Sequence, residues 1–225
     1  MTTPVHNAEL EIPVGDLRLA GSLAVPESAS GIVVFAHGSG SDRKSPRNAM
    51  VARELEDAAF ATILVDLLTP PEAQADARTG HLRFDIDLLA ERVGAVTDWL
   101  ATAPETARLD VGYFGASTGA AAALKAAATR TDRVKAIVSR GGRPDLAMDC
   151  LPKVRAATLL IVGEQDVPVL PLNREAYEAL KTEKELSIVP GAGHLFEEPG
   201  ALESVARLAR KWFERHLARA PERSA

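Results

Sequence analysis

The chain has 225 residues, of which 46% are hydrophobic and 25% are charged, and its formal net charge is -5. A chain of this length and composition can bury one substantial core, so we expect a single domain over residues 1–225. The acidic balance and the lack of a concentrated run of lysine and arginine argue against a nucleic-acid-binding protein, because phosphate recognition needs such a surface.

The N-terminal sequence and the apolar runs bear on localisation. Residues 1–10 contain neither the basic nor the apolar segment of a secretory signal peptide. No apolar run approaches the roughly 18 residues that a membrane span requires. We therefore expect a soluble, cytoplasmic protein, a monomer or homodimer, whose partner is a small molecule and not a membrane or nucleic acid.

The hydrophobic pattern predicts a hairpin followed by repeated β-α units. Residues 10–14 and 17–25 alternate apolar and polar side chains around Gly15-Asp16, which is typical of an antiparallel hairpin. Near-continuous apolar runs, typical of parallel strands buried on both faces, follow at residues 31–36, 61–65, 111–114, 134–138, 158–162 and 186–189. Helices are expected at residues 46–59, 84–101, 117–129, 173–181 and 200–218.

This order of elements predicts an α/β sandwich of three layers, with about eight mostly parallel strands flanked by helices. Residues 69–80, with Pro70-Pro71 near the start, are expected to form a long irregular loop. The stretch between the strands ending at residue 138 and starting at residue 158 is too short for a lid domain. We expect an open, shallow site with residues 69–80 and 144–151 as its movable walls.

Residues 115–119 read Gly-Ala-Ser-Thr-Gly and lie between an expected strand and an expected helix. This is the G-x-S-x-G pattern in the strand-turn-helix context that a nucleophile elbow requires. The serine occupies a strained turn, so Gly115 and Gly119 must lack side chains for strand and helix to approach. A glycine-rich turn without catalytic function would share the pattern, but its context favours Ser117 as a nucleophile.

A nucleophilic serine needs a base to take its proton and an acid to orient that base. In folds of this kind the order along the chain is serine, acid, histidine. Of the five histidines, only His194 lies in the loop after the last expected strand, where glycines allow the loop to bend over the sheet edge. Asp166 follows the penultimate strand, with Glu164 as its nearest rival, whereas Asp145 and Asp149 come from the preceding connection.

Backbone amides should stabilise the negative charge that develops on the carbonyl oxygen during acyl transfer. One donor is expected to be the amide of Thr118, directly after the nucleophile. We assign the second to Ser39, in a loop that Gly38 and Gly40 shape after the first parallel strand. His37 is expected to be a structural partner of this loop and not a base.

The same loop invites a comparison with a dinucleotide site, because a glycine-rich turn precedes a helix and Asp66 ends the next strand. Arg43 stands where the third glycine of that motif belongs, and the helix begins late, near Pro46. The sequence therefore argues against a nucleotide cofactor, and we expect neither an organic cofactor nor a metal.

Arg140 and Arg143 flank Gly141-Gly142 just beyond an expected strand. The carboxyl end of that strand faces the site, so either arginine could bind a substrate carboxylate through both guanidinium donors. The alternative is an ion pair with Asp145 or Asp149, or with Asp66 at its strand end.

With these features in place, the whole chain resembles the α/β-hydrolase superfamily, and most closely its small bacterial dienelactone-hydrolase-like members. The segment Gly115–Gly119, the His37-Gly38 pair and the Gly193-His194 pair carry the resemblance. It implies hydrolysis of an ester, thioester or lactone through an acyl-enzyme, without metal or organic cofactor. Dienelactone hydrolase proper has cysteine at the elbow, whereas this chain has Ser117, so the enol-lactone substrate does not carry over. Cys150, the single cysteine, is expected to be a packing residue.

Two other functions fit the same residues. An acyltransferase or perhydrolase would use the same triad and resolve the acyl-enzyme with a nucleophile other than water. A ligand-binding receptor would keep the triad for slow or incidental hydrolysis, and stoichiometric binding without turnover would identify it.

Overall fold

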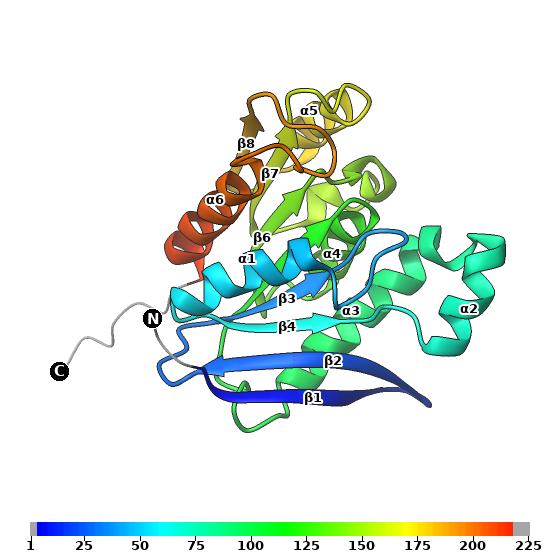
Figure 1. Cartoon of the computed structure of the whole chain (residues 1–225), viewed down its shortest axis with the longest axis vertical. Coiled ribbons are helices and arrows are strands. Elements are labelled where there is room, and N and C mark those ends of the chain that lie inside the picture. Colours follow the sequence, from blue (N-terminus) through cyan, green and yellow to red (C-terminus); the bar gives the residue numbers. More distant parts are fainter. Residues whose placement is uncertain (1–3, 218–225) are drawn as a thin grey trace.

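The computed structural model describes residues 4–217, which form an eight-stranded sheet in the order β1-β2-β4-β3-β5-β6-β7-β8 (Figure 1). The β1–β2 and β2–β4 pairs are antiparallel and all other pairs are parallel. The strands are β1 (Pro4–Val14), β2 (Leu17–Pro26), β3 (Ile32–Ala36), β4 (Ala61–Val65), β5 (Val111–Ala116), β6 (Val134–Arg140), β7 (Ala157–Gly163) and β8 (Lys184–Val189). The predicted eight-stranded, mostly parallel sheet is confirmed.

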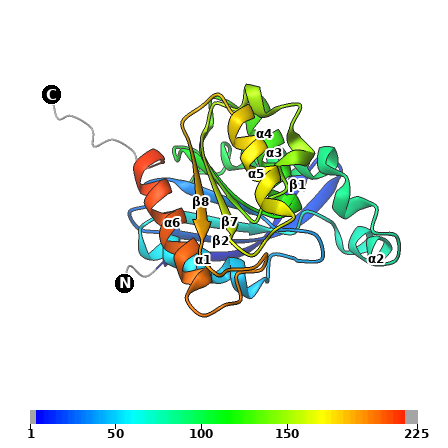
Figure 2. The same ribbon diagram turned by 90° about the horizontal axis from the view of Figure 1, so that it is seen from above.

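Helices cover both faces of the sheet, with α1 and α6 on one side and α3, α4 and α5 on the other (Figure 2). The helices are α1 (Pro46–Asp57), α2 (Pro70–Thr79), α3 (Ile86–Leu100), α4 (Thr118–Thr129), α5 (Val169–Ala179) and α6 (Ala201–His216). The last predicted helix thus ends at His216, and residue 218 lies outside the described residues. The predicted three layers are confirmed.

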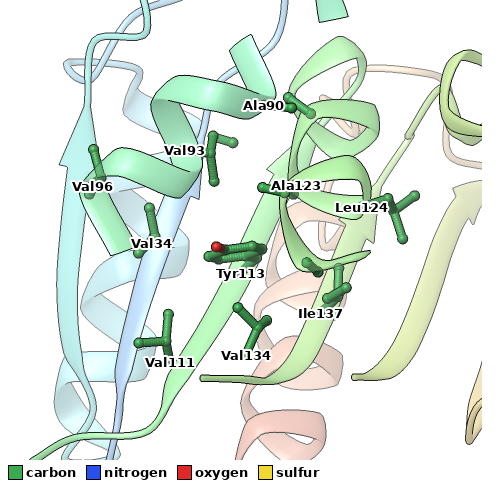
Figure 3. Close-up of a cluster of buried hydrophobic side chains, with 14 of the residues drawn as sticks. Val34, Ala90, Val93, Val96, Val111, Tyr113, Ala123, Leu124, Val134 and Ile137 are labelled. Carbon is green, nitrogen blue, oxygen red and sulfur yellow. The ribbon is translucent and has the colours of Figure 1, made fainter. Parts of the chain in front are cut away.

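The central strands are apolar throughout because each face of the sheet packs against helices. In β3, Val34 belongs to the core beneath α3 and α4, whereas Val33 and Phe35 belong to the core beneath α1 and α6. Tyr113 lies at the centre of the first core (Figure 3), and its hydroxyl forms a 2.6 Å hydrogen bond with Thr97. This bond gives the buried hydroxyl of Tyr113 a hydrogen-bonding partner, so the side chain can lie in the apolar core without an unpaired polar atom.

Residues 69–80 form helix α2 and not the irregular loop that the sequence predicted. The backbone N–H of Thr69 donates to the Glu72 carboxylate, as in a capping box. Pro70 and Pro71 occupy the first helical positions, where a missing N–H costs nothing, and Gly80 ends the helix with φ 66°. These start and stop signals were present in the sequence, and the two prolines were misread as breakers.

An ion pair fixes α2 to α3. The guanidinium of Arg92 donates to both carboxylate oxygens of Glu72, at 2.8 and 2.6 Å, and to the carbonyl of Leu67 at 2.6 Å. The Arg92 side chain is only 4% exposed, so the pair is shielded from solvent. Residues 69–80, which were expected to form a movable wall of the site, are therefore a helix anchored to α3.

Acid should weaken this anchor. The hydrogen bond from Arg92 holds the pKa of Glu72 at about 2, well below its usual 4.5. The stabilisation is complete above about pH 4.5 and is lost as pH falls towards 2. Because Glu72 is partly open to solvent, which screens the pair, we expect it to correspond to about 1–2 kcal/mol of unfolding free energy. We expect Glu72→Gln to remove most of it at pH 7, as measured by urea unfolding.

The same measurement at pH 3 provides the check, because the unfolded chain already binds a proton at Glu72 at that pH, so the difference between wild type and variant should shrink by about half. Glu105→Gln, at an exposed position after α3, is the matched control and should change the unfolding free energy by no more than about 0.5 kcal/mol. A loss in Glu72→Gln that stays the same at pH 7 and pH 3 would contradict the ion-pair explanation.

Candidate active site

Ser117 lies between the end of β5 and the start of α4 with φ 50° and ψ -120°, a conformation that residues with side chains rarely adopt. A Cβ atom on Gly119 would lie 2.2 Å from the carbonyl oxygen of Ala36. A Cβ atom on Gly115 would lie 2.4 Å from the Cα of Ala120. Both glycines are sterically required, so the predicted strained elbow is confirmed.

His194 and Asp166 meet beside this elbow. The Nδ1 atom of His194 lies 2.6 Å from Oδ2 of Asp166, whose side chain is 5% exposed. An aspartate that accepts from Nδ1–H leaves Nε2 of the ring as the basic nitrogen. Ser117 and His194 line one cavity of about 200 Å³. The structure thus brings the three predicted residues to one edge of the sheet.

Glu164, the rival acid, has a different place. Its carboxylate accepts the backbone N–H of Gly191 at 2.8 Å, and the neighbouring amide of Gln165 donates to the carbonyl of Ala192 at 2.9 Å. These bonds hold the loop that carries His194 against the end of β7. Glu164 therefore supports the loop, whereas Asp166 contacts the imidazole itself.

The two proposed oxyanion donors lie side by side. The backbone N–H of Ser39 donates to Oγ1 of Thr118 at 2.9 Å. The amide of Thr118 opens α4, where a helical N–H has no acceptor within the helix. In this arrangement the Ser39 amide becomes available to a substrate oxygen only when the Thr118 hydroxyl turns away.

His37 is held within the glycine-rich loop, as predicted. Its Nδ1 lies 3.0 Å from the carbonyl of Gly38, and its Nε2 accepts the backbone N–H of Leu67 at 3.0 Å. Both contacts are satisfied by a neutral ring that carries its proton on Nδ1. Burial lowers the pKa of His37, which favours the same neutral form. His37 therefore joins two loops and is not free to act as a base.

Asp66 is also used by the fold. Its carboxylate accepts the backbone N–H of Arg43 at 2.7 Å and the Arg43 guanidinium at 3.0 Å. In a dinucleotide site the carboxylate at this position binds the ribose of the cofactor, whereas here it binds Arg43. The contact agrees with the sequence argument against a nucleotide site.

The two candidate arginines have different surroundings. Arg143 pairs with Asp145 through two bonds of 2.8 and 2.7 Å, and Asp149 lies 3.8 Å from Lys125. Arg140 is the last residue of β6, beside Ala116 in the sheet, and it lines the cavity that contains Ser117. Arg143 therefore forms the ion pair that was the alternative to substrate binding. Of the two candidates, only Arg140 lines the cavity that contains Ser117.

Sequence reasoning missed two residues of this cavity, Arg47 and Asn48 in the first turn of α1. A signal was available: Ser45-Pro46 marks a helix start shortly after the glycine-rich loop, so the first turn must lie at the same sheet edge. Gly141 was also missed. With φ 50°, it lies so close to His194 that its Cβ would be 3.4 Å from Nδ1.

A second cavity of about 230 Å³ lies across the loop of Gly38 and Ser39, which line both cavities. Leu68, Ala73 of α2 and Leu89 contribute its apolar side. Residues 144–151, the second expected wall, line neither cavity, so that expectation is wrong.

Two features of residues 4–217 bear on the expected partners. No helix in this range is both long and apolar enough to cross a membrane. Within the same part of the chain, no three or more histidine, cysteine or acidic side chains form a group that could hold a metal ion.

The sheet order and the elbow define an α/β-hydrolase fold. The profile of the Dienelactone hydrolase family matches residues 19–218, and the chain belongs to this family. The crystal structure of dienelactone hydrolase from Anabaena variabilis is 57% identical, with a TM-score of 0.93 over 94% of this chain and 98% of that one. Est1E from Butyrivibrio proteoclasticus with bound ferulic acid is 17% identical, with a TM-score of 0.78 over 93% of this chain and all (100%) of that one, and shows the shared fold.

A Mycobacterium tuberculosis H37Rv protein named "Putative phosphoribosyl transferase" is 57% identical over 95% of this chain. The match covers 47% of that protein, so the chain spans about half the length of the curated relatives it matches.

Proposed function

We propose that the protein is a serine hydrolase that cleaves a carboxylic ester, thioester or lactone through an acyl-enzyme. The observation that carries this proposal is the 2.6 Å contact between buried Asp166 and His194, which lines the same cavity as Ser117 on its strained turn. A nucleophile, a base and an orienting acid at one sheet edge are the groups that acyl transfer requires.

The chemistry follows from these positions. Oγ of Ser117 attacks the acyl carbon while Nε2 of His194 takes the hydroxyl proton, and Asp166 stabilises the imidazolium. The amides of Thr118 and Ser39 stabilise the oxyanion once the Thr118 hydroxyl has turned. The ring then gives its proton to the departing alkoxide or thiolate. Water, deprotonated by His194, attacks the acyl-enzyme, releases the acid and restores Ser117.

The relatives support this proposal unequally. The Anabaena variabilis protein, similar over nearly its whole length, bears the name dienelactone hydrolase, which favours ester or lactone cleavage. The M. tuberculosis name concerns a protein about twice as long, so phosphoribosyl transfer is not the activity we propose for this chain. Acyl transfer and perhydrolysis use the same first half-reaction, and product analysis with added alcohol or hydrogen peroxide distinguishes them from hydrolysis.

Labelling with a fluorophosphonate probe tests the proposal. The probe forms a covalent bond with an activated serine, so wild type should be labelled and Ser117→Ala should not. His194→Ala should label at least about 100-fold more slowly, because the general base is lost. Labelled fractions are measured by intact-protein mass spectrometry.

Ser204→Ala is the matched control, because this serine lies on α6, lines neither of the two cavities at the site, and bonds to the Gly200 carbonyl. It should label at the wild-type rate. Labelling of Ser117→Ala would show that another nucleophile reacts. Binding of esters without any turnover would favour the receptor alternative.

A further inference from the structure

Arg140 is a buried cation whose side chain has no hydrogen-bonding partner in the part of the chain that the structure describes. It is 8% exposed, and its Nε and Nη1 atoms have no partner among the described residues. Buried arginine donors are normally paired with carboxylates or carbonyls, since an unpaired charged donor loses its hydration without compensation. Arg92 and Arg143 each have such an acid, whereas Arg140 has none within the same part of the chain.

The contacts around Arg140 hold the guanidinium without occupying its donors. Its carbon atom Cζ lies 6.0 Å from the ring centre of Phe196, which is 1% exposed, in a cation–π contact. The backbone carbonyl of Arg140 accepts the N–H of Ser117 at 3.2 Å, so the arginine is tied directly to the nucleophile elbow. Arg140 thus lines the cavity that contains Ser117, and its Nε and Nη1 donors are unpaired among the described residues.

The cavity around these donors has a positive lining. Arg47 is the second arginine in the lining, and no lining residue is an aspartate or glutamate. Within residues 4–217, Arg47 makes one exposed ion pair, with Glu197 at 3.1 Å, but its buried Nε lacks a partner. Burial, followed by the nearby charge of Arg47, lowers the pKa of Arg140 to about 10, so it stays protonated at neutral pH.

We infer that Arg140, with Arg47 beside it, forms an anion subsite next to Ser117, and that the preferred substrates carry a carboxylate or phosphate group close to the scissile acyl bond. The inference rests on the proposed hydrolase function and names its substrate class. A planar guanidinium with two free donors binds either oxyanion through paired hydrogen bonds. A cavity of about 200 Å³ has room for one small anionic group and a short acyl chain, because a water molecule occupies about 30 Å³ of liquid.

The overall charge of the chain works against this preference. A formal net charge of -5 repels anions at long range. A preference for anionic esters therefore has to come from local groups in the cavity. This makes the comparison of charged and neutral esters a test of the subsite and not of the general surface.

The first experiment measures binding and does not need turnover. Ser117→Ala is titrated calorimetrically with inorganic phosphate and with succinate at low ionic strength. The anion that binds more tightly shows whether the subsite prefers a phosphate or a carboxylate group. Adding Arg140→Gln should weaken binding at least about tenfold, whereas adding Arg143→Gln, which disturbs only the Asp145 pair, should leave the dissociation constant within about twofold. No binding, or equal binding to both double variants, would overturn the subsite.

The second experiment measures selectivity with esters that share a leaving group. The p-nitrophenyl monoester of succinate is compared with its neutral methyl ester and with the p-nitrophenyl ester of 3-phosphonopropionate. Wild type should show a kcat/KM at least about tenfold higher for one of the charged esters than for the neutral one. Arg140→Gln should lower that ratio at least about tenfold, and Arg143→Gln should retain it.

The two experiments separate the possible failures. Turnover of all esters without preference, together with absent anion binding, would overturn the subsite and leave the hydrolase proposal standing. Anion binding without any turnover or fluorophosphonate labelling would overturn the hydrolase proposal and retain the subsite. An equal loss on charged and neutral esters in Arg140→Gln would assign Arg140 to the oxyanion or the fold. If that variant does not fold, Arg140→Lys replaces it, because lysine keeps the positive charge but lacks the paired guanidinium donors. The ratio of kcat/KM for charged over neutral esters should then be lower than in wild type but still above one.

Discussion

Replacing Asp166 with asparagine is expected to lower kcat for a p-nitrophenyl ester about 10⁴-fold while leaving KM within a few-fold. Asp166 is 5% exposed and lies 2.6 Å from Nδ1 of His194, so its carboxylate sets which ring nitrogen carries the proton. An asparagine amide can donate to Nδ1, which places the ring proton on Nε2, where it cannot accept from Ser117. The measurement is steady-state kinetics with folding checked by circular dichroism.

Glu164→Gln is the matched control, two residues away in the same turn. Its carboxylate bonds to the Gly191 amide, and a glutamine oxygen can accept the same bond. We therefore expect less than about a tenfold loss in kcat. If Glu164→Gln costs as much as Asp166→Asn, the acid assignment is wrong.

The sequence was sufficient to predict most of the sheet because buried parallel strands are marked by their own residues. Each central strand is an uninterrupted apolar run, and β4 was predicted with its observed bounds. Helix α2 was missed because Pro70-Pro71 was interpreted as the start of a loop and the capping-box pattern of Thr69 and Glu72 was not recognised. The error was a local one and did not come from a tertiary effect.

Side-chain partners were less predictable than the backbone. Asp166 and Glu164 are two residues apart, and only the fold determines which one reaches His194. Arg140 and Arg143 looked equivalent in the sequence. Arg140 is buried without a partner among the residues that the structure describes, whereas Arg143 pairs with Asp145. Such differences arise from distances across the sheet edge, which local patterns do not encode.

Gly119→Ala should reduce the unfolding free energy by about 3 kcal/mol or more and abolish fluorophosphonate labelling. The added methyl would lie 2.2 Å from the carbonyl oxygen of Ala36 and 2.4 Å from that of His37. Both atoms are backbone, so relief requires α4 to move away from β3. That movement also displaces Ser117, because the elbow directly precedes α4.

Gly191→Ala separates this clash from simple backbone strain. Gly191 has φ 69°, but a Cβ atom there would meet nothing within 4 Å. Its cost should be about 1–2 kcal/mol, from the left-handed conformation alone. The two free energies are compared by urea unfolding at pH 7. Equal losses would mean that the close approach of α4 to β3 is not what requires glycine at position 119.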